Sequence, residues 1–111
     1  MNMPLFTGCA TALVTPFLPN GQLDEPALRR LLFMQLEAKI DALVLLGTTG
    51  EPCTLSMDER QRVIEIGLEC VGDVIPIIVG TGSNDTRHAI EYARQAQKLG
   101  VAGQLSVTPY Y

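Results

Sequence analysis

The feature that most constrains the fold of this chain is a short apolar run that recurs about every 30 residues. The runs start near residues 10, 42, 75 and 104, and stretches with helical periodicity separate them. A strand, a crossover helix and a second parallel strand together take roughly 30 residues. Because such crossovers are nearly always right-handed, the pattern predicts a parallel sheet with its helices on the outside.

The apolar runs predict four strands. Their expected spans are residues 10–16, 42–46, 75–79 and 104–107. The second run, Ala-Leu-Val-Leu-Leu, contains no polar residue, which is typical of a strand that is buried on both faces. Pro76 lies near the start of the third run, where the loss of one backbone N–H is tolerated.

Capping signals predict three helices between these strands. Asp24 is a suitable N-cap for the first helix, and Ser56 and Glu59 form a capping box at the start of the second. Gly72 and Gly100 follow the second and third helices, where glycine commonly ends a helix. The expected spans are residues 24–40, 56–72 and 86–99.

Two α/β architectures repeat this unit: an open doubly wound sheet and a (β/α)8 barrel. In a barrel, functional groups gather at the carboxyl ends of all strands, whereas an open sheet concentrates them at one switch point. Each of the four runs is followed by glycine, threonine, proline or other special residues. The sequence therefore predicts an α/β fold, the N-terminal half of a (β/α)8 barrel, with about four parallel strands and three helices. We expect residues 1–111 to form a single partial domain.

Composition limits the classes of function. The chain has 8 basic and 12 acidic side chains, a net charge of −4, and 47% hydrophobic residues. This balance argues against a nucleic-acid partner, and no apolar run approaches the ~20 residues of a membrane span. The single histidine, His88, and the absence of a CxxC pair predict no metal site. We expect Cys9, Cys53 and Cys70 to be reduced thiols in the cytoplasm that fill small apolar sites.

The segment Gly-Thr-Thr-Gly-Glu at 47–51 follows a buried strand and precedes a helix. Its glycines allow a sharp turn that exposes backbone N–H groups, and Thr48 and Thr49 add two hydroxyl groups. Such donors can bind a carboxylate or a phosphate. An ordinary strand–helix turn, in which the threonines satisfy backbone groups, is the alternative interpretation.

Two further motifs carry weaker signals. Gly80 and Gly82 resemble the start of a dinucleotide fingerprint, but Asp85 stands where the third glycine is required, which favours close backbone packing instead. Tyr110 and Tyr111 place two phenols after the fourth strand. They could relay a proton or could serve only for packing.

Taken together, the strand-end segments resemble those of the dihydrodipicolinate synthase family. The matching segments are Phe-Thr-Gly at 6–8, Val-Thr-Pro-Phe at 14–17, Gly-Thr-Thr-Gly-Glu at 47–51, Gly-Thr-Gly-Ser-Asn at 80–84 and Val-Thr-Pro-Tyr-Tyr at 107–111. The family is similar to N-acetylneuraminate lyase, another pyruvate-dependent Schiff-base enzyme. The resemblance covers nearly the whole chain and implies a (β/α)8 barrel, a homo-oligomer (dimer or tetramer) and no cofactor.

The resemblance implies a lyase that condenses pyruvate with aspartate semialdehyde in diaminopimelate and lysine biosynthesis. In the family, a lysine forms a Schiff base with pyruvate and thereby acidifies its methyl group. By motif position, Thr49 binds the pyruvate carboxylate, whereas Thr48 and Tyr111 belong to a proton relay. The family contributes the equivalent of Tyr111 across a subunit interface.

Two parts of that machinery have no match in these residues. The Schiff-base lysine and the central tyrosine of the relay come from later strands in the family. The only lysines here, Lys39 and Lys98, fall at the ends of predicted helices. We therefore expect the 111-residue chain to supply a carboxylate pocket and part of a relay, but to form no imine alone.

The family also binds lysine as an effector. Asn84 and Tyr110 match positions of that effector site. Cys53 and His88 occupy positions that commonly carry alanine and glutamate in feedback-inhibited members. Because an acidic partner for the ammonium group of lysine is missing at His88, we expect weak inhibition or none.

Two other functions stay open on the sequence alone. The chain could belong to another pyruvate aldolase or lyase with a different acceptor aldehyde. It could instead be a non-catalytic module that binds small carboxylates or associates with other copies. Half a barrel leaves two sheet edges and one apolar face open, so a fragment of a longer enzyme, a dimerising chain and a partly molten chain are all possible.

Overall fold

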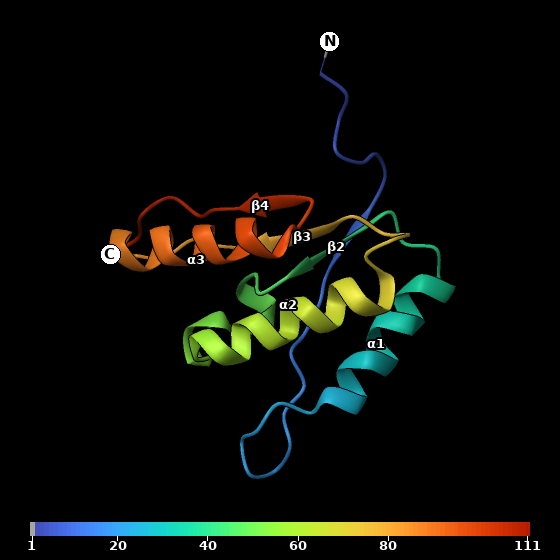
Figure 1. Cartoon of the computed structure of the whole chain (residues 1–111), viewed down its shortest axis with the longest axis horizontal. Coiled ribbons are helices and arrows are strands. Elements are labelled where there is room, and N and C mark those ends of the chain that lie inside the picture. The colour runs from blue at the N-terminus through green and yellow to red at the C-terminus, as the bar shows by residue number, and fades with distance from the viewer. Residues whose placement is uncertain (1) are drawn as a thin grey trace.

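The computed structural model describes residues 2–111, and Met1, the first residue of the predicted domain, lies outside them. The described part contains four strands and three α-helices in alternation (Figure 1). In chain order they are β1 (Ala10–Ala12), α1 (Glu25–Glu37), β2 (Ala42–Leu45), α2 (Met57–Val71), β3 (Ile77–Gly80), α3 (Thr86–Leu99) and β4 (Gly103–Leu105). Two short 3₁₀ turns, η1 (Thr48–Gly50) and η2 (Pro52–Thr54), lie between β2 and α2.

The strands form one parallel sheet in the order β1-β2-β3-β4. The three helices all lie on one side of this sheet (Figure 1). A doubly wound sheet has helices on both faces and reverses its strand order at the switch point. Sequential order with helices on one face is instead the arrangement of a (β/α)8 barrel. The predicted fold class, with four parallel strands and three helices, is therefore confirmed.

All four strands are shorter than predicted, β2 by one residue and β4 with its end at Leu105 rather than at residue 107, and proline explains part of the difference in the first and third. Strand β1 ends at Ala12 rather than at residue 16, although Leu13 still donates to the Val44 carbonyl at 3.0 Å. Pro16 has no N–H to continue the ladder. Strand β3 begins at Ile77 rather than at residue 75, because Pro76 lacks an N–H and Ile75 donates back to the Val71 carbonyl at the end of α2.

Side-chain caps fix where the helices start. In α2 the predicted capping box is complete: Glu59 N–H donates to Ser56 Oγ at 3.1 Å, and Ser56 N–H donates to Glu59 Oε1 at 2.9 Å. Asp24 caps α1 by accepting from the Ala27 N–H at 3.0 Å. Each cap satisfies a backbone donor that the first turn of a helix leaves without a partner.

The core lies between the sheet and the helices that cover it, and α2 is its central element. Helix α2 contacts α1, α3, β2 and β3. Its Gly67 faces Leu45 of β2, where a Cβ would come too close to a side-chain methyl group, so the helix can sit directly on the strand. The fully buried aliphatic side chains of this core include Leu28, Leu32, Leu43, Leu45, Ile64, Ile66, Ile77 and Val79.

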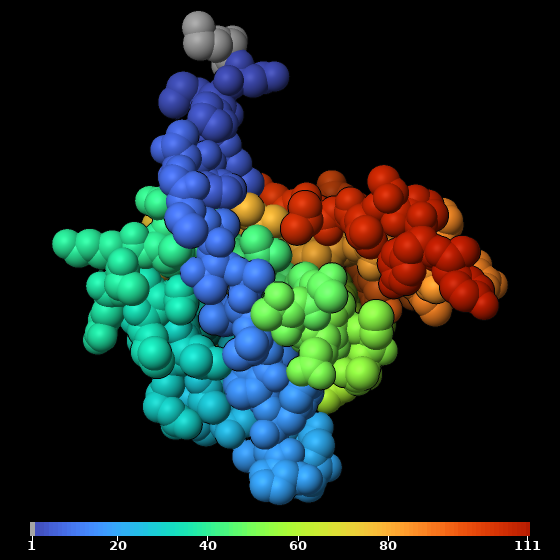
Figure 2. Space-filling model, turned by 180° about the vertical axis from the view of Figure 1, so that it is seen from behind, coloured from blue at the N-terminus to red at the C-terminus, as the bar shows by residue number. Residues whose placement is uncertain are grey.

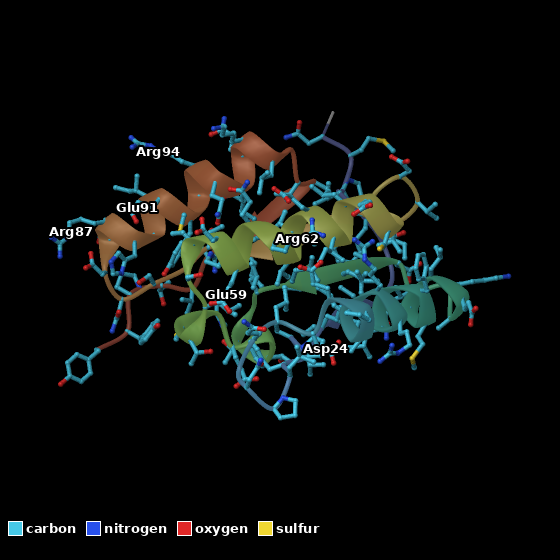
Figure 3. All side chains as sticks on the ribbon, turned by 60° about the horizontal axis from the view of Figure 1, so that its bottom comes forward. Asp24, Glu59, Arg62, Arg87, Glu91 and Arg94 are labelled. Carbon is cyan, nitrogen blue, oxygen red and sulfur yellow. The ribbon has the colours of Figure 1, made fainter. Side chains whose placement is uncertain are left out.

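Ion pairs join α1 to α2 on the outer surface. Arg62 donates through Nε and Nη2 to the two carboxylate oxygens of Glu25, at 3.0 and 2.8 Å. Arg29 pairs with Glu69 at 3.1 Å. Figure 3 shows the two helices side by side, with Arg62 on α2. The hydrogen bond from Arg62 is the main cause that holds the pKa of Glu25 below its usual value.

The cysteines depart from the sequence prediction. All three are free thiols, but Cys9 and Cys53 are exposed and only Cys70 is partly buried. The prediction that they fill small apolar sites is therefore wrong for Cys9 and Cys53, since these residues lie in the segment before β1 and in η2 rather than under a helix.

None of the helices described within residues 2–111 is long and apolar enough to cross a membrane.

The Glu25–Arg62 pair predicts a pH-dependent contribution to stability. The folded-state pKa of Glu25 lies below the ordinary value of 4.5, so the unfolded chain takes up the proton first. The contribution is therefore complete above that ordinary value and is lost as the pH falls through the folded-state pKa. We expect the free energy of unfolding, measured with urea between about pH 6 and about pH 3, to fall less in Glu25→Gln than in the wild type.

The matched control is Glu37→Gln. Glu37 is an exposed residue at the end of the same helix, and its carboxylate has no ion-pair partner within residues 2–111. This variant should keep the wild-type pH dependence. Equal pH dependence in all three proteins would show that the Glu25–Arg62 pair contributes nothing to stability.

Candidate active-site end of the sheet

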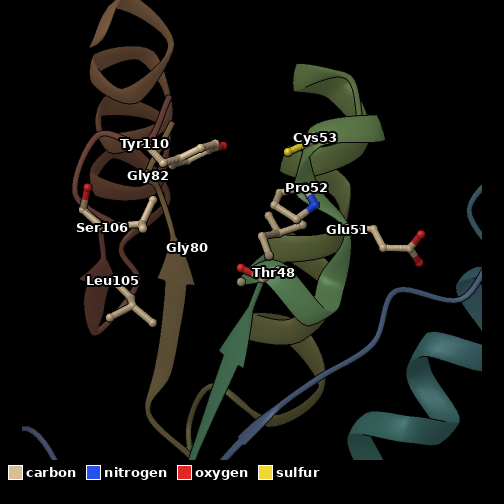
Figure 4. A pocket seen from close by; sticks show the side chains of 12 residues that line it. Thr48, Glu51, Pro52, Cys53, Gly80, Gly82, Leu105, Ser106 and Tyr110 are labelled. Carbon is tan, nitrogen blue, oxygen red and sulfur yellow. The ribbon is translucent and has the colours of Figure 1, made fainter. Parts of the chain in front are cut away.

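An open pocket of about 660 Å³ lies at the carboxyl ends of β2, β3 and β4. The turn after β2 forms one wall, and the segments that follow β3 and β4 form the other (Figure 4). Parallel α/β barrels gather their functional groups at this end of the strands. The lining residues are Leu46, Gly47, Thr48, Glu51, Pro52, Cys53, Gly80, Gly82, Leu105, Ser106, Val107 and Tyr110.

The turn after β2 has an uncommon backbone conformation at both of its ends. Leu46 and Glu51 have φ angles of 59° and 56°, in the left-handed region. Between them, Gly50 N–H donates to the Gly47 carbonyl at 2.8 Å and Glu51 N–H donates to the Thr48 carbonyl at 3.1 Å. A left-handed residue other than glycine costs about 1–2 kcal/mol and persists where surrounding contacts enforce it. Such strain concentrates at functional sites.

A buried hydroxyl group ties this turn to the end of β1. Thr15, which is 5% exposed, donates from Oγ1 to the Gly50 carbonyl at 2.7 Å. A Cβ on Gly50 would lie 3.2 Å from the Thr15 hydroxyl oxygen and 3.3 Å from the Leu13 carbonyl oxygen. Glycine at this position therefore lets the turn pack directly against the segment that follows β1.

The ends of β2 and β3 approach each other even more closely. A Cβ on Gly80 would collide with the Leu46 carbonyl and would crowd the Gly47 nitrogen. A Cβ on Gly82 would collide with the backbone nitrogen and side chain of Val107. The interpretation of these two glycines as close-packing residues, rather than as part of a dinucleotide site, is confirmed.

Arg60 of α2 lies behind the pocket wall and is almost completely buried. Its side chain is 1% exposed, its Nη2 donates to the Gly80 carbonyl at 2.9 Å, and its guanidinium carbon lies 3.9 Å from the centre of the Tyr92 ring. Burial lowers the pKa of Arg60 and Tyr92 acts in the opposite direction, yet a guanidinium group stays protonated in proteins. Its Nε finds no hydrogen-bond partner within residues 2–111.

Sequence reasoning missed Arg60 because an arginine on an amphipathic helix normally extends into solvent. Its spacing could have revealed it, because Val63 and Ile64 follow three and four residues later and are both buried. Residues at this spacing share one helix face. Arg60 therefore brings a positive charge to the pocket wall from the buried side of α2.

Thr48 and Thr49 provide unoccupied hydrogen-bond donors in the turn. Both residues are exposed, and Thr48 lines the pocket. Their backbone N–H groups and hydroxyl groups make no hydrogen bond to another group within residues 2–111. The alternative interpretation, in which the threonine hydroxyls satisfy backbone groups, is therefore wrong for this pair. The donors of Thr48 in the pocket lining, together with those of Thr49 next to it in the turn, are instead free to bind an oxyanion.

The structure brings three of the seven predicted site residues to the pocket: Thr48, Cys53 and Tyr110. Figure 4 shows the Tyr110 ring pointing across the pocket toward η2, which carries Cys53. Four predicted residues lie outside the lining: Thr49, Asn84, His88 and Tyr111. Tyr111 is fully exposed.

The start of α3 has its own electrostatic arrangement. His88 Nδ1 lies 4.0 Å from Asp85 Oδ2, and its ring centre lies 6.2 Å from that of Tyr92. The side-chain hydrogen bond from Arg87 is the main cause that lowers the pKa of Asp85. A carboxylate therefore stays close to His88 although position 88 itself is not acidic.

The two lysines lie far from this end of the sheet. Lys39 follows α1, and Lys98 lies in the last turn of α3. Because each helix returns antiparallel to the strands, the carboxyl ends of the helices lie at the opposite end of the sheet from the pocket. Glu51 is the only charged residue in the lining itself, and within residues 2–111 no three His, Cys, Asp or Glu side chains cluster as metal ligands would.

Four parallel strands in sequential order, helices on one face and a pocket at the strand ends define part of a (β/α)8 barrel with its functional end formed. Residues 5–111 match the dihydrodipicolinate synthetase family. The chain belongs to this family.

Individual relatives agree with this membership. The 4-hydroxy-tetrahydrodipicolinate synthase of Protochlamydia amoebophila is 52% identical over 94% of this chain and 35% of its own length. The dihydrodipicolinate synthase structure from Thermotoga maritima is 48% identical, with a TM-score of 0.93, and is matched over 97% of this chain and 36% of its own. A pyruvate complex of the Acinetobacter baumannii enzyme is 44% identical with a TM-score of 0.90, over 94% of this chain and 36% of its own. The chain thus spans about a third of the length of these relatives.

The close approach at Gly80 predicts a large effect of a single methyl group. We expect Gly80→Ala to lower the free energy of unfolding by about 3 kcal/mol, because neither the Leu46 carbonyl nor the Gly47 nitrogen can move away without shifting β2. Chemical denaturation monitored by circular dichroism measures the difference.

Gly47→Ala is the matched control. Its Cβ would lie 3.3 Å from a Val44 methyl group, which can move, and its φ of −74° suits alanine. This variant should change the free energy of unfolding by less than about 1 kcal/mol. Equal stability of the two variants would contradict the role of Gly80 in the approach of β2 and β3.

Proposed function

We propose that this chain forms the carboxylate-binding part of a 4-hydroxy-tetrahydrodipicolinate synthase, a lyase that condenses pyruvate with aspartate semialdehyde. The observation that carries the proposal is the strained turn after β2, whose unpaired donors come from Thr48 in the pocket lining and from the adjacent Thr49. The names of the relatives support it, as does the pyruvate bound to the Acinetobacter baumannii enzyme.

The carboxylate of pyruvate binds at the turn. Thr49 donates from its N–H and hydroxyl groups to one carboxylate oxygen, and the adjacent Thr48 N–H is available to the other. Arg60 lies behind the Gly80 wall and adds a positive charge with which no carboxylate within residues 2–111 pairs. Hydrogen-bond donors stabilise an anion most strongly when they are already held in position and need not reorganise as it binds.

The hydroxyl of Thr48 forms one end of the proton relay. It lies in the wall opposite Tyr110 (Figure 4), while Tyr111 lies outside the pocket lining and is fully exposed. This placement suits a Tyr111 that serves the pocket of a neighbouring subunit in a homo-oligomer. A hydroxyl relay moves protons efficiently when its members share hydrogen bonds with each other and with the substrate.

The imine requires a lysine from outside these 111 residues. Lys39 and Lys98 lie at the opposite end of the sheet and cannot reach a pyruvate held at the turn. Imine formation joins the lysine nitrogen to C2 of pyruvate and releases water, and the iminium then acidifies the methyl group. We infer that residues 1–111 form one partial domain, which binds the carboxylate but forms no imine alone.

A chimera tests this division directly. Residues 1–111 are joined to the remaining two thirds of the Thermotoga maritima enzyme, whose corresponding part is 48% identical. We expect the chimera to condense pyruvate with aspartate semialdehyde and to be trapped by borohydride with pyruvate. The 111-residue chain alone should not be trapped. Specific trapping at Lys39 or Lys98 in that chain would overturn the assignment.

Two threonine variants of the chimera separate binding from proton transfer. Thr48→Val should lower kcat by about 100-fold with little change in KM for pyruvate, because the relay loses its hydroxyl. Thr49→Val should raise KM for pyruvate about tenfold, because a carboxylate donor is lost. Thr86→Val, at an exposed position in the first turn of α3, is the control and should change neither.

Lysine inhibition gives a separate test of the effector positions. Cys53 and Tyr110 line the pocket, whereas Asn84 and His88 lie outside it. We expect little inhibition of the chimera by lysine and about tenfold greater sensitivity in His88→Glu, which supplies a carboxylate for the ammonium group. His88→Gln is the neutral control. Strong inhibition with His88 unchanged would contradict the proposed insensitivity.

A further inference from the structure

Arg60 is the only charged residue within residues 2–111 that is buried. It is 1% exposed, its Nη2 donates to the Gly80 carbonyl at 2.9 Å, and its guanidinium carbon lies 3.9 Å from the centre of the Tyr92 ring. These contacts join α2, which carries Arg60, to β3 and α3. All three elements lie within this chain, so the enclosure of Arg60 does not depend on any further segment.

Stability alone gives no reason for an arginine at this position. Burial removes the guanidinium from water, and no carboxylate within residues 2–111 forms an ion pair with it. Arg60 also lies in the first turn of α2, where its N–H donates to the Ser56 carbonyl at 2.9 Å. The helix dipole is positive at this end and disfavours a second positive charge. An unbranched apolar side chain would fill the same space without either cost.

The carbonyl group that Arg60 holds belongs to the wall of the pocket. Gly80 lines the pocket, has no side chain, and lies against the Leu46 carbonyl and the Gly47 nitrogen. Thr48 follows directly in the turn. A single backbone therefore separates the guanidinium from the pocket. The turn itself lies at the surface, where Figure 2 shows it in green beside the red C-terminal segment, so the charge is hidden directly behind an accessible site.

Within residues 2–111, the pocket lining carries no positive charge of its own. Its one charged residue is Glu51, and Asp58 stands nearby at the start of α2. Both are exposed, and water screens exposed charges strongly. A charge enclosed by protein is screened much less, so the field of Arg60 acts through the Gly80 wall. An anion in the pocket therefore finds its positive counter-charge behind the wall rather than in the lining.

We propose that Arg60 makes the pocket selective for the ionised carboxylate of a 2-oxo acid, through its charge behind the Gly80 wall and without touching the substrate. This rests on the proposed function, which takes the turn of Thr48 and Thr49 as the carboxylate site. Gly80 and Tyr92 hold the charge in place, so it need not reorganise when the anion binds. Arg60 is then a specificity-determining residue, and a neutral analogue of the substrate gains nothing from it.

The chimera with the Thermotoga maritima enzyme provides the test, because calorimetry measures pyruvate binding without aspartate semialdehyde. Arg60→Met keeps the length and apolar packing of the side chain but removes the charge. We expect the dissociation constant of pyruvate to rise about tenfold, and that of pyruvamide, its neutral amide, to change by less than about twofold. The melting temperature should be no lower than with Arg60, because the cost of burying the charge is relieved.

Arg62→Met is the matched control. It removes the same charge from the same helix, but the Arg62 side chain is 41% exposed on the outer surface and pairs with Glu25. Because solvent screens that charge, the dissociation constant of pyruvate should stay within about twofold of the unsubstituted value.

Arg60→Lys makes the buried charge titratable. Burial lowers the pKa of a lysine, whereas a guanidinium group stays protonated. We expect this variant to bind pyruvate nearly as well as the unsubstituted chimera at about pH 6 and to approach Arg60→Met at about pH 9. The ratio of the two dissociation constants at each pH removes any effect that the proteins share. If Arg60→Met does not fold, this ratio decides: a rise with pH supports the proposal, and a constant ratio overturns it.

Equal loss of pyruvate and pyruvamide binding in Arg60→Met would show a packing role and overturn the proposal, as would unchanged pyruvate binding. The proposed function fails separately. A chimera that binds pyruvate but does not condense it with aspartate semialdehyde would contradict that function, while the same dissociation constants still decide the role of Arg60. A chimera that binds no pyruvate would overturn both.

Discussion

The approach of β2 to β3 at Leu46 and Gly80 sets the positions of the groups around the pocket. No side chain fits between these two backbones, so the turn after β2 starts from a fixed point. From there the left-handed Leu46 redirects the chain, and the hydrogen bond from Thr15 to Gly50 holds the far side of the turn at 2.7 Å. Three strands are thereby locked together at one end, and the donors of Thr48 and Thr49 project from the rim that they form.

Arg60 of α2 supports this end of the sheet through its hydrogen bond to the Gly80 carbonyl. A buried guanidinium loses several kcal/mol of hydration, and no carboxylate within residues 2–111 pairs with it. A hydrogen bond to Gly80 and stacking on Tyr92 recover part of that energy, at about 1–2 kcal/mol each. A hydrophobic side chain could fill the same space with less loss of hydration. The position of the charge, beside the proposed carboxylate site, gives a functional reason for an arginine there.

The sequence predicted the elements well because each rests on local chemistry. The capping box of Ser56 and Glu59, the apolar run of β2 and the glycine after α3 act within a few residues, and all three appear where predicted. Strand ends were less predictable, because the end of β1 depends on where its neighbour stops pairing. The role of Arg60 was hidden for the same reason: its partners, Gly80 and Tyr92, are 20 and 32 residues away in the chain. In the site, the motif placed Thr48 at the pocket, whereas the fully exposed side chain of Tyr111 follows from tertiary structure alone.

Carboxylate binding and imine chemistry can be separated because a barrel builds its site from independent strand ends. Each strand contributes its own turn, and the contacts that hold the β2 turn come from β1, β3 and α2, all within this chain. The proposed carboxylate site therefore needs no residue from outside this chain to hold the shape of its turn. The imine differs, since it requires an amine within bonding distance of C2 of pyruvate, and both lysines lie at the other end of the sheet.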